Sequence, residues 1–466
     1  MIEYEKESEN FDAIIIGSGQ AGNPLAKDLA SSGWKVAVVE RSHTGGSCIN
    51  YGCTPSKTMA ASALTADFVR RSSEYGIHTS IKKISMTEIY NRKKETVESF
   101  RRGTLERLKS SENIFLIKGE AIFLDAKTVK VISKNKNTRF INSKKIFINT
   151  GGSALIPSID GLDKISYMNS TSIMDLEELP KHLLILGGGY IGVEFGQMFR
   201  RFGSDVTIIQ KGKQLLSRED PDIASEVKKI FEEDGINVLL YSESKKIKKG
   251  KNEILLTVEV NGKEKIISGS HLLIATGHKP NTENLNLEST GIKTDKRGYI
   301  KVNNKLETNI EGIYALGDVK GGPAFTHISY DDYRVVRDNI LQNGSRTTRG
   351  RLVPYTIFID PQLGRVGLNE IQAKEKGVDY SLAKMPMDYV TRAIELGKTR
   401  GMMKIIIDKK TEKILGCTIL GIEGGELMNM IQIAMMGNLK YSRLQEAIFT
   451  HPTLGESLNT VFSHIN

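Results

Sequence analysis

Cys48 and Cys53 are two of only three cysteines among 466 residues, and four residues separate them. A structural disulfide closing so short a loop would constrain little of the unfolded chain, so the spacing favours redox chemistry over a stabilising role. Pro55 and the helix-forming run after it indicate that Cys53 begins a helix, where exposed N–H groups favour a thiolate. We therefore expect Cys53 to be the more acidic thiol. A zinc site is less favoured, because no second Cys/His pair stands nearby in the sequence.

A glycine-rich turn before this pair has the element order of a dinucleotide-binding unit. A β-branched run ending at Ile16 leads into Gly17-Ser18-Gly19-Gln20-Ala21-Gly22, then a helical stretch, then a second strand that ends at Glu40. The glycines let a pyrophosphate approach the helix N-terminus, and Glu40 is placed to bond a ribose hydroxyl. Because the cysteine pair follows directly, we expect FAD here.

The fingerprint is repeated at Gly187-Gly188-Gly189-Tyr190-Ile191-Gly192. Two such units imply two nucleotides, and a flavin beside a nicotinamide is the pairing that suits a nearby disulfide. The next strand ends at Gln210 and Lys211, where an NAD site would present an acid to the ribose 2′-hydroxyl. Gln210 tolerates a 2′-phosphate and Lys211 and Lys213 could attract one, so NADPH is favoured over NADH.

The pattern changes near Gly350 to strands with hairpin signals. Cys417 lies in one of these strands, far from the other cysteines, and is expected to be a small buried apolar residue. The methionines of the following segment are expected to fill a helix interface rather than to bind a soft metal. They are Met428, Met430, Met435 and Met436.

The segment GGSCINYGCTPSK closely resembles the active-site segment of the class I flavin-dependent pyridine nucleotide-disulfide oxidoreductases. The resemblance implies an α/β fold with two Rossmann-like dinucleotide-binding domains, for FAD and NAD(P), and a C-terminal α+β dimerisation domain. It places the FAD-binding domain at 1–150 and 280–349, the NAD(P)-binding domain at 151–279 and the dimerisation domain at 350–466.

The same resemblance implies roles for the residues that handle thiols. Cys48 becomes the interchange thiol that faces the substrate, and Cys53 the thiol that contacts the flavin. The HPTxxE pattern makes His451 an acid/base held by Glu456, and it serves the interchange thiol of the other subunit in a homodimer. A histidine suits this task because its ordinary pKa lies near 7.

Cofactor contacts are implied in the same way. Tyr190 would cover the flavin, Glu194 would pair with Lys57 near flavin N5, and Asp318 would accept hydrogen bonds from ribitol hydroxyls. The residues expected to bind the cofactors are Gly17, Ser18, Gly19, Ala21, Gly22, Glu40, Gly46, Ser47, Lys57, Gly119, Ala121, Thr150, Gly151, Gly187, Gly189, Tyr190, Ile191, Gly192, Glu194, Gln210, Lys211, Gly277, Gly317, Asp318, Ala324, Phe325 and Thr326.

The segments KIFINTG, ILGGGYIGVEF, SREDPDIA and FTHPTLGESLN resemble the mercuric-reductase-like branch, and within it the copper(II)-reducing flavoproteins of reactive-chlorine resistance. We therefore expect a metal ion or another small oxidant as substrate, with Cys48 and Cys53 as its transient ligands. Two expected features distinguish this chain from true mercuric reductase. It lacks the C-terminal cysteine pair of that enzyme, and it has His451, a histidine that mercuric reductase lacks. A dihydrolipoamide dehydrogenase, a reductase of glutathione or another small disulfide, and a non-enzymatic redox sensor remain open.

The formal charge of +10 raises the question of nucleic acid, but basic and acidic residues are interleaved, which favours a solvated surface. The first residues are polar and acidic, unlike a secretory signal, and no apolar run reaches about 18 residues. We expect a cytoplasmic protein that binds neither nucleic acid nor membrane.

Overall fold

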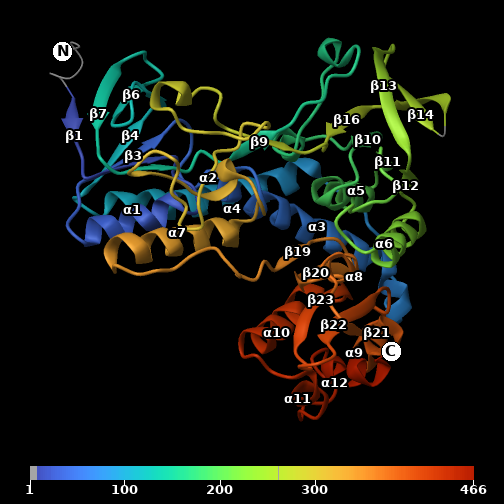
Figure 1. Cartoon of the computed structure of the whole chain (residues 1–466). Helices are drawn as coiled ribbons and strands as arrows, with labels where there is room; N and C mark the ends of the chain where they lie inside the picture. The colour runs from blue at the N-terminus through green and yellow to red at the C-terminus, as the bar shows by residue number, and fades with distance from the viewer. Residues whose placement is uncertain (1–7, 261, 466) are drawn as a thin grey trace. The chain divides into compact units, whose positions relative to one another are not determined.

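A computed structural model describes residues 8–260 and 262–465, and the chain divides into two compact units (Figure 1). The first unit takes in the chain up to residue 58, 91–155 and 278–351, and the second takes in 59–90, 156–277 and the chain from 352 on. The mixed α/β fold class is confirmed. The division into three domains stays a prediction.

A five-stranded parallel sheet, in the order β18-β8-β2-β3-β4, forms the centre of the first unit. Its strand β2 is buried throughout, as expected for a parallel strand covered on both faces. The helices α1 and α7 pack together against it (Figure 1). The bounds are β2 Ala13–Ile16, β3 Val36–Glu40, β4 Ile114–Lys118, β8 Ile146–Ile148, β18 Ile313–Ala315, α1 Gly22–Ser31 and α7 Thr326–Leu341.

Two smaller sheets and the helices α2, α3 and α4 also lie wholly or partly in this unit. One sheet has the order β1-β7-β6-β5 and the other pairs β9 with β17. The helices α3 and α4 have residues in both units. The bounds are β1 Glu9–Asn10, β5 Glu120–Phe123, β6 Thr128–Ile132, β7 Thr138–Asn142, β9 Gly152–Ala154, β17 His278–Pro280, α2 Gly46–Asn50, α3 Cys53–Arg71 and α4 Met86–Lys109.

The second unit contains its own parallel sheet, in the order β12-β11-β10-β16, beside an antiparallel sheet of β13, β14 and β15. Apolar faces of α5 and α6 pack in one core with β10 and β11. The bounds are β10 His182–Leu186, β11 Asp205–Ile209, β12 Asn237–Leu239, β13 Ser242–Lys249, β14 Ile254–Val260, β15 Lys263–Gly269, β16 His271–Ile274, α5 Tyr190–Phe202 and α6 Pro221–Glu233.

A five-stranded antiparallel sheet, in the order β19-β20-β23-β22-β21, forms the C-terminal part of the same unit. The helix α10 packs across β20 and β23 (Figure 1). The bounds are β19 Tyr355–Ile357, β20 Gln362–Gly367, β21 Tyr380–Pro386, β22 Met402–Asp408, β23 Ile414–Gly421, α8 Glu370–Glu375, α9 Thr391–Glu395, α10 Gly424–Met436, α11 Tyr441–Gln445 and α12 Ser457–Thr460.

Cys417 is fully buried in β23, as expected, and this burial raises the pKa of its thiol to about 12. Of the methionines on α10, Met428 is buried, whereas Met430 and Met436 are exposed. Met428 packs in the core beneath α10, and the expectation that the exposed methionines fill a helix interface stays a prediction.

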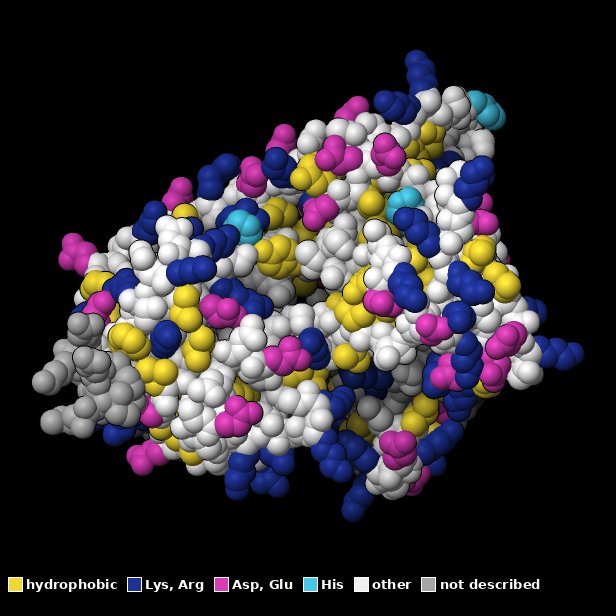
Figure 2. All heavy atoms as spheres, turned by 90° about the horizontal axis from the view of Figure 1, so that it is seen from above, with side chains coloured by type: hydrophobic (Ala, Val, Ile, Leu, Met, Phe, Trp, Pro, Cys, Tyr) yellow, Lys and Arg dark blue, Asp and Glu magenta, His cyan; other side chains and the backbone are white. Residues whose placement is uncertain are grey.

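Acidic and basic side chains are intermingled over the face shown in Figure 2. This distribution agrees with the interleaved charges of the sequence. In the part of the chain that the structure describes, no helix is both long enough and apolar enough to cross a membrane.

Candidate active site

The turn between β2 and α1 requires glycine at positions 17 and 19. A Cβ atom at Gly17, where φ is +101°, would lie 2.3 Å from the carbonyl oxygen of Asn149, and one at Gly19 would lie 2.7 Å from Oδ1 of the same residue. That Oδ1 atom accepts a hydrogen bond from Gly22 N at 3.0 Å, at the start of α1. The turn therefore presents bare backbone at a helix N-terminus, which is the arrangement that fits a dinucleotide pyrophosphate.

Glu40 lies beside this turn, at the end of β3. Its Oε2 atom accepts hydrogen bonds from Ser18 N at 3.0 Å and from Ser18 Oγ at 2.7 Å. Gly119 N donates to the carbonyl oxygen of Glu40 at 3.1 Å, which brings the strand junction before β5 to the same edge. The residues expected to bind the adenosine half of FAD are therefore neighbours, and their chemistry fits that group.

The segment that carries the cysteines is attached directly to the same turn. Gly45 N donates to Ser18 O at 3.0 Å, and Gln20 Nε2 donates to Gly45 O at 3.0 Å. A Cβ atom at Gly46, where φ is +65°, would lie 2.7 Å from Cα of Gly19. The dinucleotide turn and the cysteine segment are thus held together by backbone hydrogen bonds and close packing.

The two thiols lie together at the junction of two helices. Cys48 is half-buried in α2 and Cys53 is exposed at the first position of α3, as the sequence predicted for its helix. A hydrogen bond to Cys53, and then burial, raise the pKa of the Cys48 thiol well above its ordinary range. The expectation that Cys53 is the more acidic thiol stays a prediction.

Thr326 reaches Cys53 from the first position of α7. Its Oγ1 atom lies 3.3 Å from Cys53 Sγ. Thr326 was expected to line the flavin, so this contact places the Cys53 sulfur beside a predicted flavin residue. The ring of Phe325, the preceding residue, stacks on that of His327 with 5.4 Å between centroids.

Asp318 follows β18 at the edge of the parallel sheet. Burial raises the pKa of its carboxyl, against the opposing charges of His278 and Lys320. A carboxyl of this kind is stabilised by donors such as ribitol hydroxyls. The fully buried Asp332 accepts a hydrogen bond from Gly317 N at 2.9 Å and so fixes the backbone that carries Asp318.

The structure distributes the other predicted cofactor residues between the two units. Thr150 and Gly151 follow β8, and Thr150 Oγ1 donates to Asn281 O at 2.8 Å. The first unit contains Gly17, Ser18, Gly19, Ala21, Gly22, Glu40, Gly46, Ser47, Lys57, Gly119, Ala121, Thr150, Gly151, Gly317, Asp318, Ala324, Phe325 and Thr326. The second contains Gly187, Gly189, Tyr190, Ile191, Gly192, Glu194, Gln210, Lys211 and Gly277.

The second glycine-rich turn resembles the first at its opening glycine and differs at its middle one. A Cβ atom at Gly187, where φ is +107°, would lie 2.4 Å from Ala275 O, whereas one at Gly189 would meet no atom within 4 Å. Gly189 therefore faces open space, which fits a nucleotide phosphate. Gln210 Oε1 accepts a hydrogen bond from Gly188 N at 2.9 Å and ties the predicted specificity residue to this turn.

Lys211, expected to attract a 2′-phosphate, already has an acidic partner. Its Nζ atom lies 2.6 Å from Oε1 of Glu243 in β13, and the Lys211 side chain is 77% exposed. Hydrogen bonds from Lys211 and Lys245 lower the pKa of Glu243 to about 2. No sequence pattern indicated that Glu243 would pair with Lys211, because the two residues lie in different segments of the chain.

Glu194 lies in α5, where its Oε1 atom accepts a hydrogen bond from Phe358 N at 2.9 Å. Lys57 lies in α3, within the first unit, so its predicted pairing with Glu194 stays a prediction.

His451 and Glu456 form the predicted pair in the C-terminal segment. The Nδ1 atom of His451 lies 2.9 Å from Glu456 Oε2 and 3.1 Å from Oε1. The histidine side chain is 66% exposed and the glutamate 32%. The carboxylate orients the ring, and Nε2 is left as the nitrogen that can exchange a proton with a substrate or thiol.

The pyridine nucleotide-disulphide oxidoreductase model matches residues 11–332, and its dimerisation-domain model matches 353–462. The chain belongs to this family. The family is that of flavoprotein oxidoreductases that use FAD and a nicotinamide cofactor, so this protein is an enzyme of that class. Membership confirms the resemblance found in the active-site segment.

Two relatives and one solved structure illustrate the likeness. The chain is 40% identical to the probable pyridine nucleotide-disulfide oxidoreductase RclA of Escherichia coli, over 97% of this chain and 99% of that protein. It is 35% identical to a mercuric reductase of Staphylococcus aureus, over 98% of this chain and 82% of the reductase. A solved Cu(II) complex of the HOCl-induced flavoprotein disulfide reductase RclA from Escherichia coli matches with a TM-score of 0.90 and 38% identity, over 98% of this chain and 99% of that one.

Two other places in the second unit gather charged side chains. Asp220, Asp222 and Glu370 bring three carboxylates within 4.8 Å of one another, but the Lys404 ammonium bonds to each of them, at 2.9, 2.9 and 2.6 Å. The lysine thus serves as the counter-ion of this cluster. Its side chain is buried.

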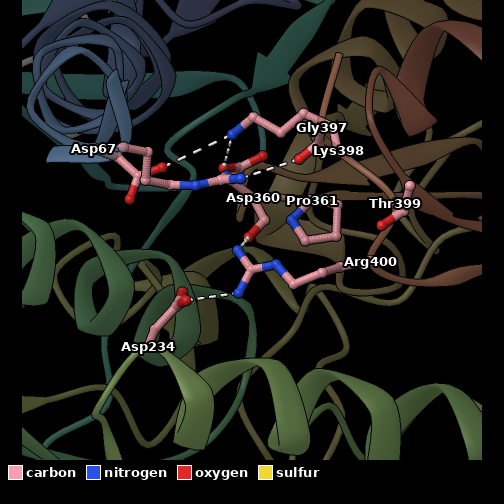
Figure 3. A pocket seen from close by; sticks show the side chains of 9 residues that line it. Asp67, Asp234, Asp360, Pro361, Gly397, Lys398, Thr399 and Arg400 are labelled. Atoms are coloured by element: carbon pink, nitrogen blue, oxygen red, sulfur yellow. Dashed lines mark hydrogen bonds and ion pairs between the residues drawn. The ribbon is translucent and has the colours of Figure 1, made fainter. Parts of the chain in front are cut away.

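The second place is a pocket of about 300 Å³ lined by residues of the second unit (Figure 3). Arg400 pairs with Asp234 at 2.6 Å, and Lys398 pairs with Asp360 at 3.1 Å. Arg71 pairs with Glu74 at 2.6 Å. Each of these lining cations has an acidic partner, so the positive charges of the pocket are neutralised by carboxylates. The pocket is therefore not the candidate site.

Sequence reasoning missed Asn149, Asp332 and Glu243. Asn149 had one available signal, since it ends a strand immediately before the predicted cofactor residues Thr150 and Gly151. No sequence signal was available for Asp332 or Glu243. Asp332 bonds to the backbone of Gly317 and Glu243 to the side chain of Lys211, each in another segment of the chain.

Proposed function

We propose that this protein is an NADPH-dependent reductase that uses the Cys48–Cys53 pair to reduce a metal ion, with copper(II) as the favoured substrate. The observation that carries the proposal is the hydrogen-bonded pair of thiols attached to the dinucleotide turn. Two sulfurs form a soft donor set suited to copper or mercury. Such a pair can bind a metal ion without a pocket shaped for an organic disulfide.

The proposed reaction oxidises the two thiols and reduces two metal ions. Cys48 and Cys53 lose two electrons and two protons when they form a disulfide, and two copper(II) ions each take one electron to become copper(I). FAD, when bound, supplies the means by which the electron pair of NADPH returns the disulfide to the dithiol. Cys53, at the start of α3, provides the first thiolate, and Cys48 holds its proton until a base removes it.

That base is His451 of the other subunit in a homodimer. The exposure of the His451 ring and its orientation by Glu456 support this assignment, since the ring is presented outward. Exposed apolar residues on α10, Met430, Ile433 and Met436, support the dimer. They lie within the segment that matches the family's dimerisation domain.

NADPH is proposed over NADH because Gln210 stands where an acid would repel a 2′-phosphate. Lys211 is engaged by Glu243 on an exposed surface, where solvent screening makes an ion pair weak. A bound phosphate can therefore compete with Glu243 for this lysine.

The alternative is a dihydrolipoamide dehydrogenase, or a reductase of glutathione or another small disulfide. The observation that favours it is the His451–Glu456 pair, because thiol–disulfide exchange with an organic substrate needs an oriented acid/base. The retained histidine does not forbid metal reduction, in which it would accept the Cys48 proton.

One panel assay decides between these functions. The holoenzyme with NADPH is given copper(II), mercury(II), lipoamide or glutathione disulfide, and Cys48→Ser is the control. We expect copper(I) formation that the variant loses, with lipoamide and glutathione disulfide used at least about tenfold less efficiently. A kcat/KM for lipoamide within about 10⁴ to 10⁸ M⁻¹s⁻¹ would contradict the metal assignment.

A further inference from the structure

Asn50 is the last residue of α2, the short helix that carries Cys48, and its side chain bonds back to the start of that helix. The Nδ2 atom of Asn50 donates to Gly46 O at 2.9 Å and to Thr44 O at 3.0 Å. Asn50 and Thr44 are both buried. These two hydrogen bonds span the whole of α2, so Cys48 lies within a turn that one side chain holds closed.

Arg101 of α4 binds the other end of the Asn50 amide. Its Nε atom donates to Asn50 Oδ1 at 2.8 Å. A guanidinium has donors and no acceptor, so it can bind this amide only at the oxygen. The nitrogen of the amide, with both of its hydrogens, is then turned toward the two carbonyl oxygens at the start of α2. Arg101 therefore selects the one orientation in which Asn50 closes the helix.

The helix that supplies Arg101 is also attached to the helix that carries Cys53. Arg92, which lies on α4 as well, donates from Nη1 to Thr58 O in α3 at 2.7 Å. All of these residues belong to the first unit. The helix α4 thus contacts both of the helices that carry a thiol, α2 through Arg101 and α3 through Arg92. Arg101 therefore acts on α2 from a support that is fixed relative to Cys53.

We infer that Arg101 is a positioning residue that, through Asn50, holds the segment between Cys48 and Cys53 in the conformation from which their disulfide closes. The inference rests on the proposed function, in which these two cysteines form the redox couple. Closure joins the two sulfurs, removes two electrons and two protons from the thiols, and restricts the four residues between them. Because the Asn50 hydrogen bonds already restrict this segment, less conformational freedom is lost when the disulfide forms. Arg101 acts only through Asn50.

The test is the thiol–disulfide equilibrium of the holoenzyme in oxygen-free mixtures of oxidised and reduced dithiothreitol. Oxidised dithiothreitol takes two electrons and two protons from Cys48 and Cys53 and becomes the reduced dithiol. Alkylation of the remaining thiols, followed by peptide mass spectrometry, gives the fraction of disulfide. Arg101→Ala should lower the equilibrium constant for disulfide formation by about three- to tenfold, the scale of one hydrogen bond to a charged group. A tenfold change raises the reduction potential of the couple by about 30 mV.

Three further variants separate positioning from a general effect on stability. Arg101→Lys keeps one donor for Asn50 Oδ1 and should give a smaller shift than Arg101→Ala. Asn50→Asp keeps an acceptor for Arg101 but places a carboxylate oxygen against the two carbonyl oxygens at the start of α2, so it should shift the equilibrium as Arg101→Ala does. Arg107→Gln, which alters an arginine of α4 that bonds to Thr104 within the same helix, should behave as the parent does.

The deciding comparison is made in an Asn50→Ala background. There, Arg101→Ala should cause no further shift of the equilibrium, because the amide that it orients is gone. An equal shift in both backgrounds, or an Arg101→Ala enzyme that unfolds more easily but keeps the equilibrium of the parent, would overturn the inference. If Asn50→Ala does not fold, equal shifts in Arg101→Lys and Arg101→Ala would overturn it. Failure of the parent holoenzyme to form this disulfide, or of NADPH to reduce it, would instead overturn the proposed function on which the inference rests.

Discussion

Glu456 holds His451 by its Nδ1 atom, at 2.9 Å from Oε2, and so leaves Nε2 to exchange a proton. A carboxylate in this position fixes both the tautomer and the direction of the ring. The exposure of that ring is what a histidine serving the thiol of a second subunit requires.

Replacing His451 with alanine should slow turnover with a disulfide substrate by about 10² to 10⁴, the range of a positioned acid/base. Flavin reduction by NADPH, followed by stopped-flow absorbance, should stay unchanged because it precedes the thiol step. Glu456→Gln should give a smaller loss. Mixed dimers of His451→Ala and Cys48→Ser subunits should recover activity, and no recovery would refute an active site shared between subunits.

The division of roles between the thiols can be read from absorbance. About one equivalent of NADPH, added without oxygen, should produce a long-wavelength band from the Cys53 thiolate beside oxidised flavin, since thiolates form readily at helix N-termini. Cys53→Ser should abolish the band. Cys48→Ser should show it before reduction, and an oxidised spectrum like that of the parent would reverse the two roles.

The reactivity of Cys48 should depend on pH in a way that Cys53 controls. Its pKa is raised, first by the hydrogen bond to Cys53 and then by burial, so its thiolate forms only at high pH. Cys53→Ser removes the neighbouring sulfur, and the pKa of Cys48 should fall. Alkylation of the reduced enzyme, followed by peptide mass spectrometry, should then begin at lower pH. An unchanged or higher midpoint would count against the hydrogen bond.

Nucleotide preference should respond to Gln210 and Glu243 in opposite directions. Gln210→Glu keeps an acceptor for Gly188 N but adds a charge that repels a 2′-phosphate, so kcat/KM should shift toward NADH. Glu243→Gln releases Lys211 and should increase the preference for NADPH. Steady-state kinetics with both nucleotides measures each shift. Glu226→Gln, on α6, is the matched control for surface charge.

Lys404 should be the residue whose loss costs most stability among the lysines of its cluster. Lys404→Met leaves Asp220, Asp222 and Glu370 without their shared buried cation and should lower the free energy of unfolding by about 3–5 kcal/mol. Lys384→Met removes one partly exposed ion pair with Asp222 and should cost about 0–1 kcal/mol. Denaturant unfolding measures both, and similar losses would contradict the assignment of Lys404 as the counter-ion.

Local patterns in the sequence predicted the two glycine-rich turns and the helix that begins at Cys53, and the resemblance to the family predicted the His451–Glu456 pair. Each of these depends on neighbours a few residues apart. The turn at Gly17 requires a positive φ, which glycine adopts easily. A thiol at the first residue of a helix lies near the exposed N–H groups of that helix, independently of tertiary contacts.

Contacts between distant segments were decided by tertiary structure alone. Asn149 supports Gly22 across 127 residues, Thr326 reaches Cys53 across 273, and Tyr355 bonds to Glu219 across 136. Hydrophobic periodicity shows which face of a strand is buried, but it does not show which strand ends meet. Packing of whole sheets and helices selects those partners, and it alone placed Glu243 on Lys211 and Lys404 among three carboxylates.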